Sequence, residues 1–138
     1  MNPLSSHDSV TLAEGNTQVN VADQSDNSTS SFMVSSGKWY WEGKQTVGTL
    51  GMVGIRPEGM NVYQNSLFGV GDIIGFALDL DSATQTITFY KNGASQGAIN
   101  IATSGLTWGF SFTSGGGSDT FQMNFGNPPY SISSGNLF

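Results

Sequence analysis

The segment from Gly71 to Gly93 constrains the fold more than any other part of the sequence. Its first half, GDIIGFALDLD, alternates with a period of two, which is typical of a strand with one face against a core. The alternation places on one face Ile74, Phe76, Leu78 and Leu80. A polar turn at Ser82–Gln85 leads to the run TITFYK, and Asn92-Gly93 is a strong signal for a tight hairpin. The segment therefore predicts three consecutive antiparallel strands, a meander.

The rest of the chain also favours strands over helices. No window shows apolar residues at a spacing of three and four over several turns, and glycine recurs too often for a long helix. Val10–Val21 predicts a hairpin that turns at Gly15, and polar loops are expected at 22–31, 56–65 and 114–118. Further strands are expected at 31–34, 37–45, 50–55, 107–113 and 119–126. Many short strands without helices between them indicate an all-β fold, a two-layer antiparallel β-sandwich.

The tripeptide Trp39-Tyr40-Trp41 lies inside one of these predicted strands. Strand geometry puts both tryptophans on one face and Tyr40 on the other. The favoured interpretation is that the two tryptophans belong to the core. The alternative is an exposed aromatic platform on which a carbohydrate ring could stack.

Length and charge narrow the classes of function. The 138 residues fit one domain, 1–138, with an N-terminal tail at 1–9 and a C-terminal extension at 127–138. The net charge of −6, with 4 Lys and Arg residues, gives no basic patch, so we expect no nucleic-acid partner. The start, MNPLSSHDSV, lacks the features of an export signal, and no apolar run approaches a membrane span, so we expect a soluble chain without membrane insertion.

The carboxylates of Asp79 and Asp81 are the strongest candidates for catalysis. Two positions apart on a strand, they face the same way with their α-carbons roughly 6.5–7 Å apart, a spacing that overlaps that of glycosidase pairs. A glycosidase pair must flank the scissile bond, however, whereas neighbours on one strand approach it from one side. Asp81 also opens the turn at Ser82, where a carboxylate can accept backbone N–H groups. We therefore interpret the pair as structural.

The remaining motifs do not assemble a catalytic or cofactor site. Gly93-Ala94-Ser95-Gln96-Gly97 matches the G-x-S-x-G pattern of hydrolases, but the residues after it, AINIA, do not predict the helix that this motif requires. The single histidine, His7, lies in the predicted tail, and there is no cysteine. We predict that the protein is not an enzyme and has no catalytic residues, no cofactor and no metal site.

Five segments, in order, resemble the SPRY domain family. They are GKWYWE at 37–42, GMVGI at 51–55, GDIIGFALDLD at 71–81, TITFYKNGASQG at 86–97 and FQMNFGNPPY at 121–130. The resemblance spans roughly Pro3 to Asn136 and implies a concanavalin-like jelly-roll sandwich that acts as a binding module. One departure is Gly43-Lys44-Gln45, which interrupts the alternation and leaves the length of that strand open.

The ends of the chain point to a narrower group. NPL followed by VTLAEGN, and NFGNPPYSISSGN, look like the SPRY domains of bacteriophage virion and tail-associated proteins. The resemblance implies a virion structural or accessory protein that attaches to another virion protein or to a host surface molecule. The alternative is the carbohydrate-binding receptor-recognition domain of a phage adhesin. A homo-oligomer is compatible with either.

The resemblance also implies where a partner would bind. SPRY domains bind with loops at one edge of the sandwich, which correspond here to Arg56–Leu67, Ser82–Gln85 and Ser104–Trp108. The expected partner-binding residues are Arg56, Asn61, Tyr63, Gln64 and Trp108. Arg, Tyr and Trp dominate binding hot spots, which is why Arg56, Tyr63 and Trp108 come first; Tyr63 and Trp108 could instead be core or rim residues.

Overall fold

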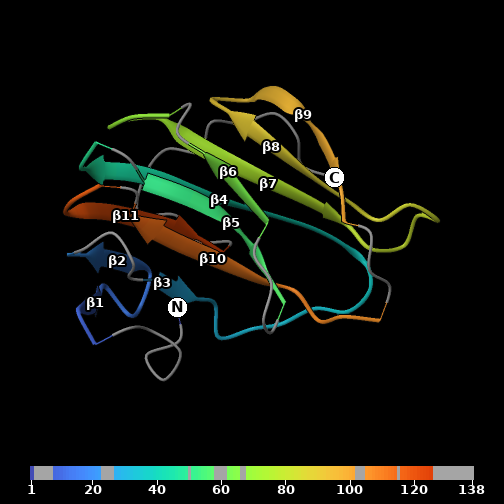
Figure 1. The fold of residues 1–138 in the computed structure, drawn as a ribbon, viewed down its shortest axis with the longest axis horizontal. Helices are drawn as coiled ribbons and strands as arrows, with labels where there is room; N and C mark the ends of the chain where they lie inside the picture. The colour runs from blue at the N-terminus through green and yellow to red at the C-terminus, as the bar shows by residue number, and fades with distance from the viewer. Residues whose placement is uncertain are drawn as a thin grey trace.

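The computed structural model describes residues 1, 8–22, 27–49, 51–57, 62–65, 68–101, 105–114 and 116–125, with the backbone alone at 27 and 62–65. The strands in these ranges form two antiparallel sheets. The seven-stranded sheet has the order β1-β2-β11-β4-β7-β8-β9, and the four-stranded sheet has the order β3-β10-β5-β6. In Figure 1 the four-stranded sheet lies over the larger one, with β5 across β4 and β10 across β11. The predicted all-β sandwich is confirmed.

The strand bounds are as follows: β1 Val10–Ala13, β2 Gln18–Val21, β3 Asn27–Thr29, β4 Lys38–Val47, β5 Gly51–Arg56, β6 Val62–Asn65, β7 Ile73–Asp79, β8 Thr86–Lys91, β9 Ala94–Asn100, β10 Gly109–Ser114 and β11 Asp119–Asn124. β4 continues through Gly43 to Val47, so this glycine does not shorten the strand. Within the described residues no helix has the length and apolar character needed to cross a membrane.

The meander predicted from the central segment is confirmed as β7, β8 and β9, which are neighbours in the larger sheet. Asn92 and Gly93 both have positive φ, 49° and 84°, as the tight two-residue turn of a β-hairpin requires. Ile74, Phe76 and Leu78 are each at most 2 % exposed, as the alternation predicted for the inward face. The hairpin β1–β2 is also confirmed, with positive φ at Glu14, Gly15 and Asn16.

Two strands were missed, and one predicted strand is absent. β3 lies in the predicted loop 22–31 and β6 in the predicted loop 56–65. Both are short edge strands, whose pairing depends on a neighbour that is distant in sequence or on a loop geometry that the residues do not reveal. Residues 31–34 form no strand; Val34 makes only an isolated bridge with Trp108.

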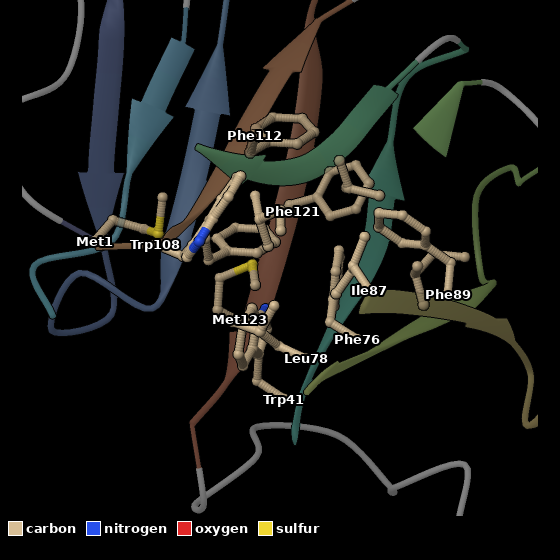
Figure 2. Packing of buried hydrophobic residues seen from close by; sticks show 14 of the residues in the cluster. Met1, Trp41, Phe76, Leu78, Ile87, Phe89, Trp108, Phe112, Phe121 and Met123 are labelled. Atoms are coloured by element: carbon tan, nitrogen blue, oxygen red, sulfur yellow. The ribbon is translucent and has the colours of Figure 1, made fainter. Parts of the chain in front are cut away.

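Aromatic side chains from both sheets fill the core (Figure 2). Phe76 of β7 meets Phe110 of β10 edge to face, with ring centroids 5.0 Å apart. Trp41 stacks on Phe76 with ring centroids 5.8 Å apart, and further along the core the ring centroids of Phe112 and Phe121 are 4.1 Å apart. Such contacts tie the sheets together in a fixed register, because aromatic pairs add specific geometry to the burial of their surface.

Candidate binding surface

Four connections meet at one end of the sandwich. β5 and β10 reach it at the pair Arg56–Gly109, and Val34 bridges to Trp108 just before β10. The N–H of Leu80 donates to the carbonyl of Gly37 at 3.0 Å, and the N–H of Ile101 donates to Gln85 at 2.9 Å. We call this surface the loop end and define it by residues 31–39, 56–57, 79–85 and 105–108. Parts of all three segments that the sequence predicted for partner binding therefore lie at the same end: residues 56–57, Ser82–Gln85 and residues 105–108. β6 runs away from this end, because Val62 pairs with Ile55 and Asn65 with Met52.

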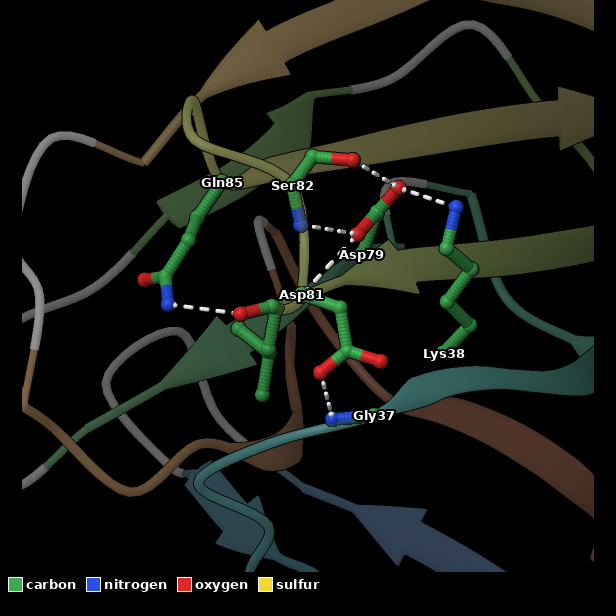
Figure 3. Close-up of polar contacts among 7 residues, drawn as sticks. Gly37, Lys38, Asp79, Asp81, Ser82 and Gln85 are labelled. Carbon is green, nitrogen blue, oxygen red and sulfur yellow. Dashed lines mark hydrogen bonds and ion pairs between the residues drawn. The ribbon is translucent and has the colours of Figure 1, made fainter.

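Hydrogen bonds to two aspartate side chains hold the turn between β7 and β8 (Figure 3). Asp79 Oδ1 accepts the N–H groups of Asp81 and Ser82, both at 3.0 Å, and Oδ2 accepts the Ser82 hydroxyl at 2.8 Å. Asp81 Oδ1 accepts the N–H of Gly37 at 2.7 Å and so joins this turn to the segment that enters β4. Both carboxylates hold the backbone, in agreement with the structural role predicted for them.

Charge reinforces the same turn. Lys38 Nζ lies 2.9 Å from Asp79 Oδ2, and the two side chains are 53 % and 25 % exposed. The hydrogen bond from Lys38, together with those from Ser82 and Asp81, holds the pKa of Asp79 well below its usual range. The same hydrogen bond raises the pKa of Lys38. A carboxylate that stays ionised and engaged is suited to anchoring a turn and poorly suited to proton transfer.

Trp39 corrects the expectation that both tryptophans are buried. Trp41 is 4 % exposed, whereas Trp39 is 43 % exposed. Strand alternation puts both on the same, inner face. Phe110, the second residue of β10, already meets Trp41 with ring centroids 6.4 Å apart, so Trp39 lies beyond the start of β10. The Trp39 indole N–H donates to the carbonyl of Ser36 at 2.7 Å, which fixes the ring while leaving much of it in contact with solvent.

Other apolar side chains are exposed nearby. Met33 is 42 % exposed on the segment before β4, and Phe125, just after β11, is 38 % exposed and lies edge to face with Phe32 at 5.1 Å. The other large apolar side chains that the structure shows as exposed are Val47 and Val70. The loop end thus combines apolar side chains with an ion-paired polar turn, a mixture that is typical of protein-binding patches.

The residues expected to bind a partner differ in their location and in how much of them the structure describes. Arg56 ends β5 at the loop end and is partly exposed. Tyr63 and Gln64 lie in β6, opposite Gly54 and Val53, and the structure describes only their backbone. Asn61 lies outside the described residues.

Trp108 takes the core position that the sequence analysis kept as its alternative to partner contact. Its side chain is 1 % exposed and belongs to the core cluster, so in this structure the ring supports the loop end from beneath and offers a partner no surface. Its backbone bridges to Val34, a segment distant in the sequence, and a local sequence pattern does not reveal such a contact. Trp39 and Met33, which sequence reasoning did not select, supply exposed apolar surface there instead.

A polar pair lies on the outer face of the larger sheet. The Tyr40 hydroxyl donates to Glu42 Oε1 at 2.8 Å, and a side chain at Gly75 would collide with the Tyr40 ring. Burial and the neighbouring Glu42 raise the pKa of Tyr40. Tyr40 thus lies on the face opposite Trp41, as predicted, and Gly75 leaves room for its ring.

Among the described residues, no group of three or more His, Asp or Glu side chains could hold a metal ion. Ser95 of the G-x-S-x-G match lies in β9, where its hydroxyl accepts the N–H of Gly97 at 3.2 Å. A serine inside an edge strand lacks the strand-to-helix turn that exposes a hydrolase nucleophile.

Comparisons with known proteins identify the fold. The structure is similar to the SPRY domain of human HERC1, with a TM-score of 0.71 and 14 % identity, over 91 % of this chain and 98 % of that one. It is also similar to the TRIM65 PSpry domain, with a TM-score of 0.69 and 15 % identity, over 88 % of this chain and 86 % of the other. No protein-family model and no curated protein sequence matches the chain. The fold is therefore that of a SPRY β-sandwich, shared at low sequence identity.

Proposed function

We propose that this protein is a non-enzymatic binding module that recognises a protein partner through the loop end. The observation that carries the proposal is Trp39, which is 43 % exposed and held by a hydrogen bond to Ser36. A ring that is already ordered loses little conformational freedom when a partner covers it, and tryptophan is enriched among the residues that dominate binding energy. The fold supports the proposal by analogy: the structure is similar to two SPRY domains, and a rigid scaffold of packed strands can present binding loops at its edge.

The surroundings of Trp39 suggest how it would act. Met33 adds a flexible apolar side chain that can adapt to a partner's surface, and Arg56 adds a cation that can form paired hydrogen bonds. Lys38 and Asp79 neutralise each other and hold the turn. The loop end would therefore bind by shape and apolar contact, with Arg56 giving orientation.

The narrower proposal concerns the partner. The sequence resemblance at both chain ends supports a role as a structural or accessory protein of a phage virion, bound to another virion protein or to a host surface molecule. In purified particles of the source phage, the protein should then be present at a fixed ratio to the major virion proteins. Its absence from particles whose other structural proteins are detected would overturn the virion role and leave the binding module standing.

Photo-crosslinking tests the loop end itself. A photoreactive phenylalanine analogue at position 39 should crosslink to a single virion or host protein in intact particles. The matched control is position 70, since Val70 is 59 % exposed but lies near the turn that precedes β7, at the other end of that strand from Asp79. Equal crosslinking from both positions, or crosslinks from position 70 alone, would contradict binding through the loop end.

Once crosslinking has identified the partner, the dissociation constant of its complex with each variant measures how much a residue contributes to binding. Trp39→Ala should weaken binding by roughly tenfold or more, as truncation of a hot-spot residue does, whereas Val70→Ala should change it little. Retained affinity in Trp39→Ala would remove Trp39 as the anchor.

Carbohydrate recognition is the second candidate, because an exposed indole ring can stack on a sugar. Trp41 is buried against Phe76, so a platform of two tryptophans does not form and Trp39 would act alone. A glycan array probed with the wild type and with Trp39→Ala separates the candidates. Sugar binding that disappears in the variant favours an adhesin, and an empty array with a crosslinked protein favours the first proposal.

A further inference from the structure

The turn Asn92-Gly93 lies at the end of the sandwich opposite the loop end, between β8 and β9. It is the one Asn-Gly dipeptide in the sequence, and both residues are exposed. Asn-Gly is chemically labile because glycine has no side chain to hinder its own amide nitrogen. That nitrogen can attack Cγ of the asparagine, forming a C–N bond while the side-chain amide leaves as ammonia. Water then opens the resulting succinimide to aspartate or isoaspartate.

Both polar atoms of the Asn92 side chain are occupied. Nδ2 donates to Asp72 Oδ1 at 2.7 Å, and Oδ1 accepts the N–H of Ile73 at 2.9 Å. The Asn92 backbone N–H also donates to the carbonyl of Ile73 at 2.8 Å. The two side-chain bonds fix the amide against the start of β7, and the backbone bond anchors the residue itself, so the amide cannot turn freely towards the nitrogen of Gly93.

Asp72 is itself held from two further sides. Its Oδ2 accepts the N–H of Gly69 at 2.8 Å and lies 2.9 Å from Lys91 Nζ. Burial tends to raise the pKa of Asp72, but the bonds from Gly69, Lys91 and Asn92 together lower it, so the carboxylate is ionised at neutral pH. An ionised acceptor binds the Asn92 amide more strongly than a neutral one would.

We propose that Asn92 is a deamidation site and that its hydrogen bond to Asp72 keeps it unreactive. We further propose that deamidation weakens the contacts that hold the β8–β9 hairpin at this end of the sandwich. In the unmodified protein the Asn92 amide donates to the Asp72 carboxylate. The product would place a second carboxylate there instead, and two negative charges at that distance repel each other. Isoaspartate would also lengthen the backbone inside a two-residue turn whose geometry sets the β8–β9 register. Each event would change the net charge from −6 by one further negative unit.

The site is remote from the loop end, which gives the proposal a separate readout. Asn92 follows the last residue of β8, whereas the turn at Ser82–Gln85 precedes its first. Conversion should loosen the β8–β9 hairpin and leave the Asp79 turn intact. Binding through Trp39 should therefore persist after deamidation.

The experiment compares deamidation rates at mildly alkaline pH and body temperature. The wild type, Asp72→Ala and the matched control Asp81→Ala are each incubated, and conversion at position 92 is followed by peptide mapping that resolves aspartate from isoaspartate. Asp72→Ala should react roughly tenfold faster than the other two, because a hydrogen bond to a charged group is worth about that factor. Equal rates in Asp72→Ala and the wild type would overturn the proposal.

A second measurement does not depend on how well the variant folds. A synthetic peptide spanning Phe89–Ala94 gives the unprotected rate under the same conditions. The folded wild type should react at least about tenfold more slowly than this peptide. A wild-type rate equal to that of the peptide would show that the folded turn gives no protection, which also overturns the proposal.

Discussion

Asp79 and Asp119 show how a carboxylate can serve structure in two different surroundings. Asp79 lies at the surface, where four donors from its own turn and from Lys38 surround it. Asp119 is 1 % exposed and accepts hydrogen bonds from Gln45, Thr49 and Ser114. In both cases the acid organises backbone and neighbouring side chains, which is the role that Asp79 was predicted to have.

Replacing Asp79 tests that role. Asp79→Ala removes the acceptor for two backbone N–H groups and should lower the free energy of unfolding by about 1–2 kcal/mol, measured by urea denaturation. Because the turn remains exposed to water, the loss should be partial and the fold should persist. Asp8→Ala, another exposed acid, is the control and should be nearly neutral. An unchanged unfolding midpoint in Asp79→Ala would contradict the structural reading.

Gly48 tolerates no side chain, for two reasons. Its φ is +113°, and a Cβ there would overlap with Asp119 Oδ1. Gly48→Ala should therefore destabilise by more than about 3 kcal/mol or prevent folding. The control is Gly71→Ala, which has φ +94° and open space around the added methyl, so only backbone strain of about 1 kcal/mol applies. Similar melting temperatures for the two variants would show that the overlap with Asp119 is relieved.

Strand β4 shows how much of an element local sequence can predict. Alternation correctly separated Tyr40 from Trp41, yet it also placed Trp39 in the core. The inner face of a strand is buried only where the opposite sheet extends far enough, and β10 begins at Gly109. The length of a facing strand depends on residues far away in the sequence, so no local pattern could reveal it.

Buried Asp119 links elements of both sheets. It lies on β11 and binds Gln45 of β4, at 2.9 Å, and Ser114 of β10, at 2.6 Å. Asp119→Ala should cost about 3 kcal/mol, because it leaves buried donors without an acceptor. Thr120→Ala, at the next and partly exposed position, is the control and should cost much less. A loss in Asp119→Ala no larger than in Thr120→Ala would show that water replaces the carboxylate.

The two ends of the molecule carry different sets of side chains. The loop end carries Trp39, Met33 and Arg56, and the opposite end is held by Asp72 with Asn92 and Lys91. The aromatic core between them keeps the sheets in register. A change at one end should therefore be felt at the other only if it disturbs that core.

Acid sensitivity should reflect both ends together. Asp72 and Asp79 each have a lowered pKa in the folded protein. Their contribution is therefore fully present above the unfolded pKa of about 3.9 and is lost as pH falls through the folded values. The free energy of unfolding should decline below about pH 4. In Asp72→Asn/Asp79→Asn the decline should be shallower, and an identical slope in wild type and variant would show that other groups dominate.

The sequence by itself determined the fold class, the meander β7–β9, the Asn92-Gly93 turn and the structural role of Asp79, because each depends on residues close together in the chain. Only the tertiary structure decided that Trp108 is buried and that Trp39 is exposed. It also decided that β3 and β6 complete the smaller sheet and that the Asn92 side chain donates a hydrogen bond to Asp72. These features depend on which distant segments meet. Burial of a side chain is a property of what lies opposite it, and no local alternation of residues encodes that.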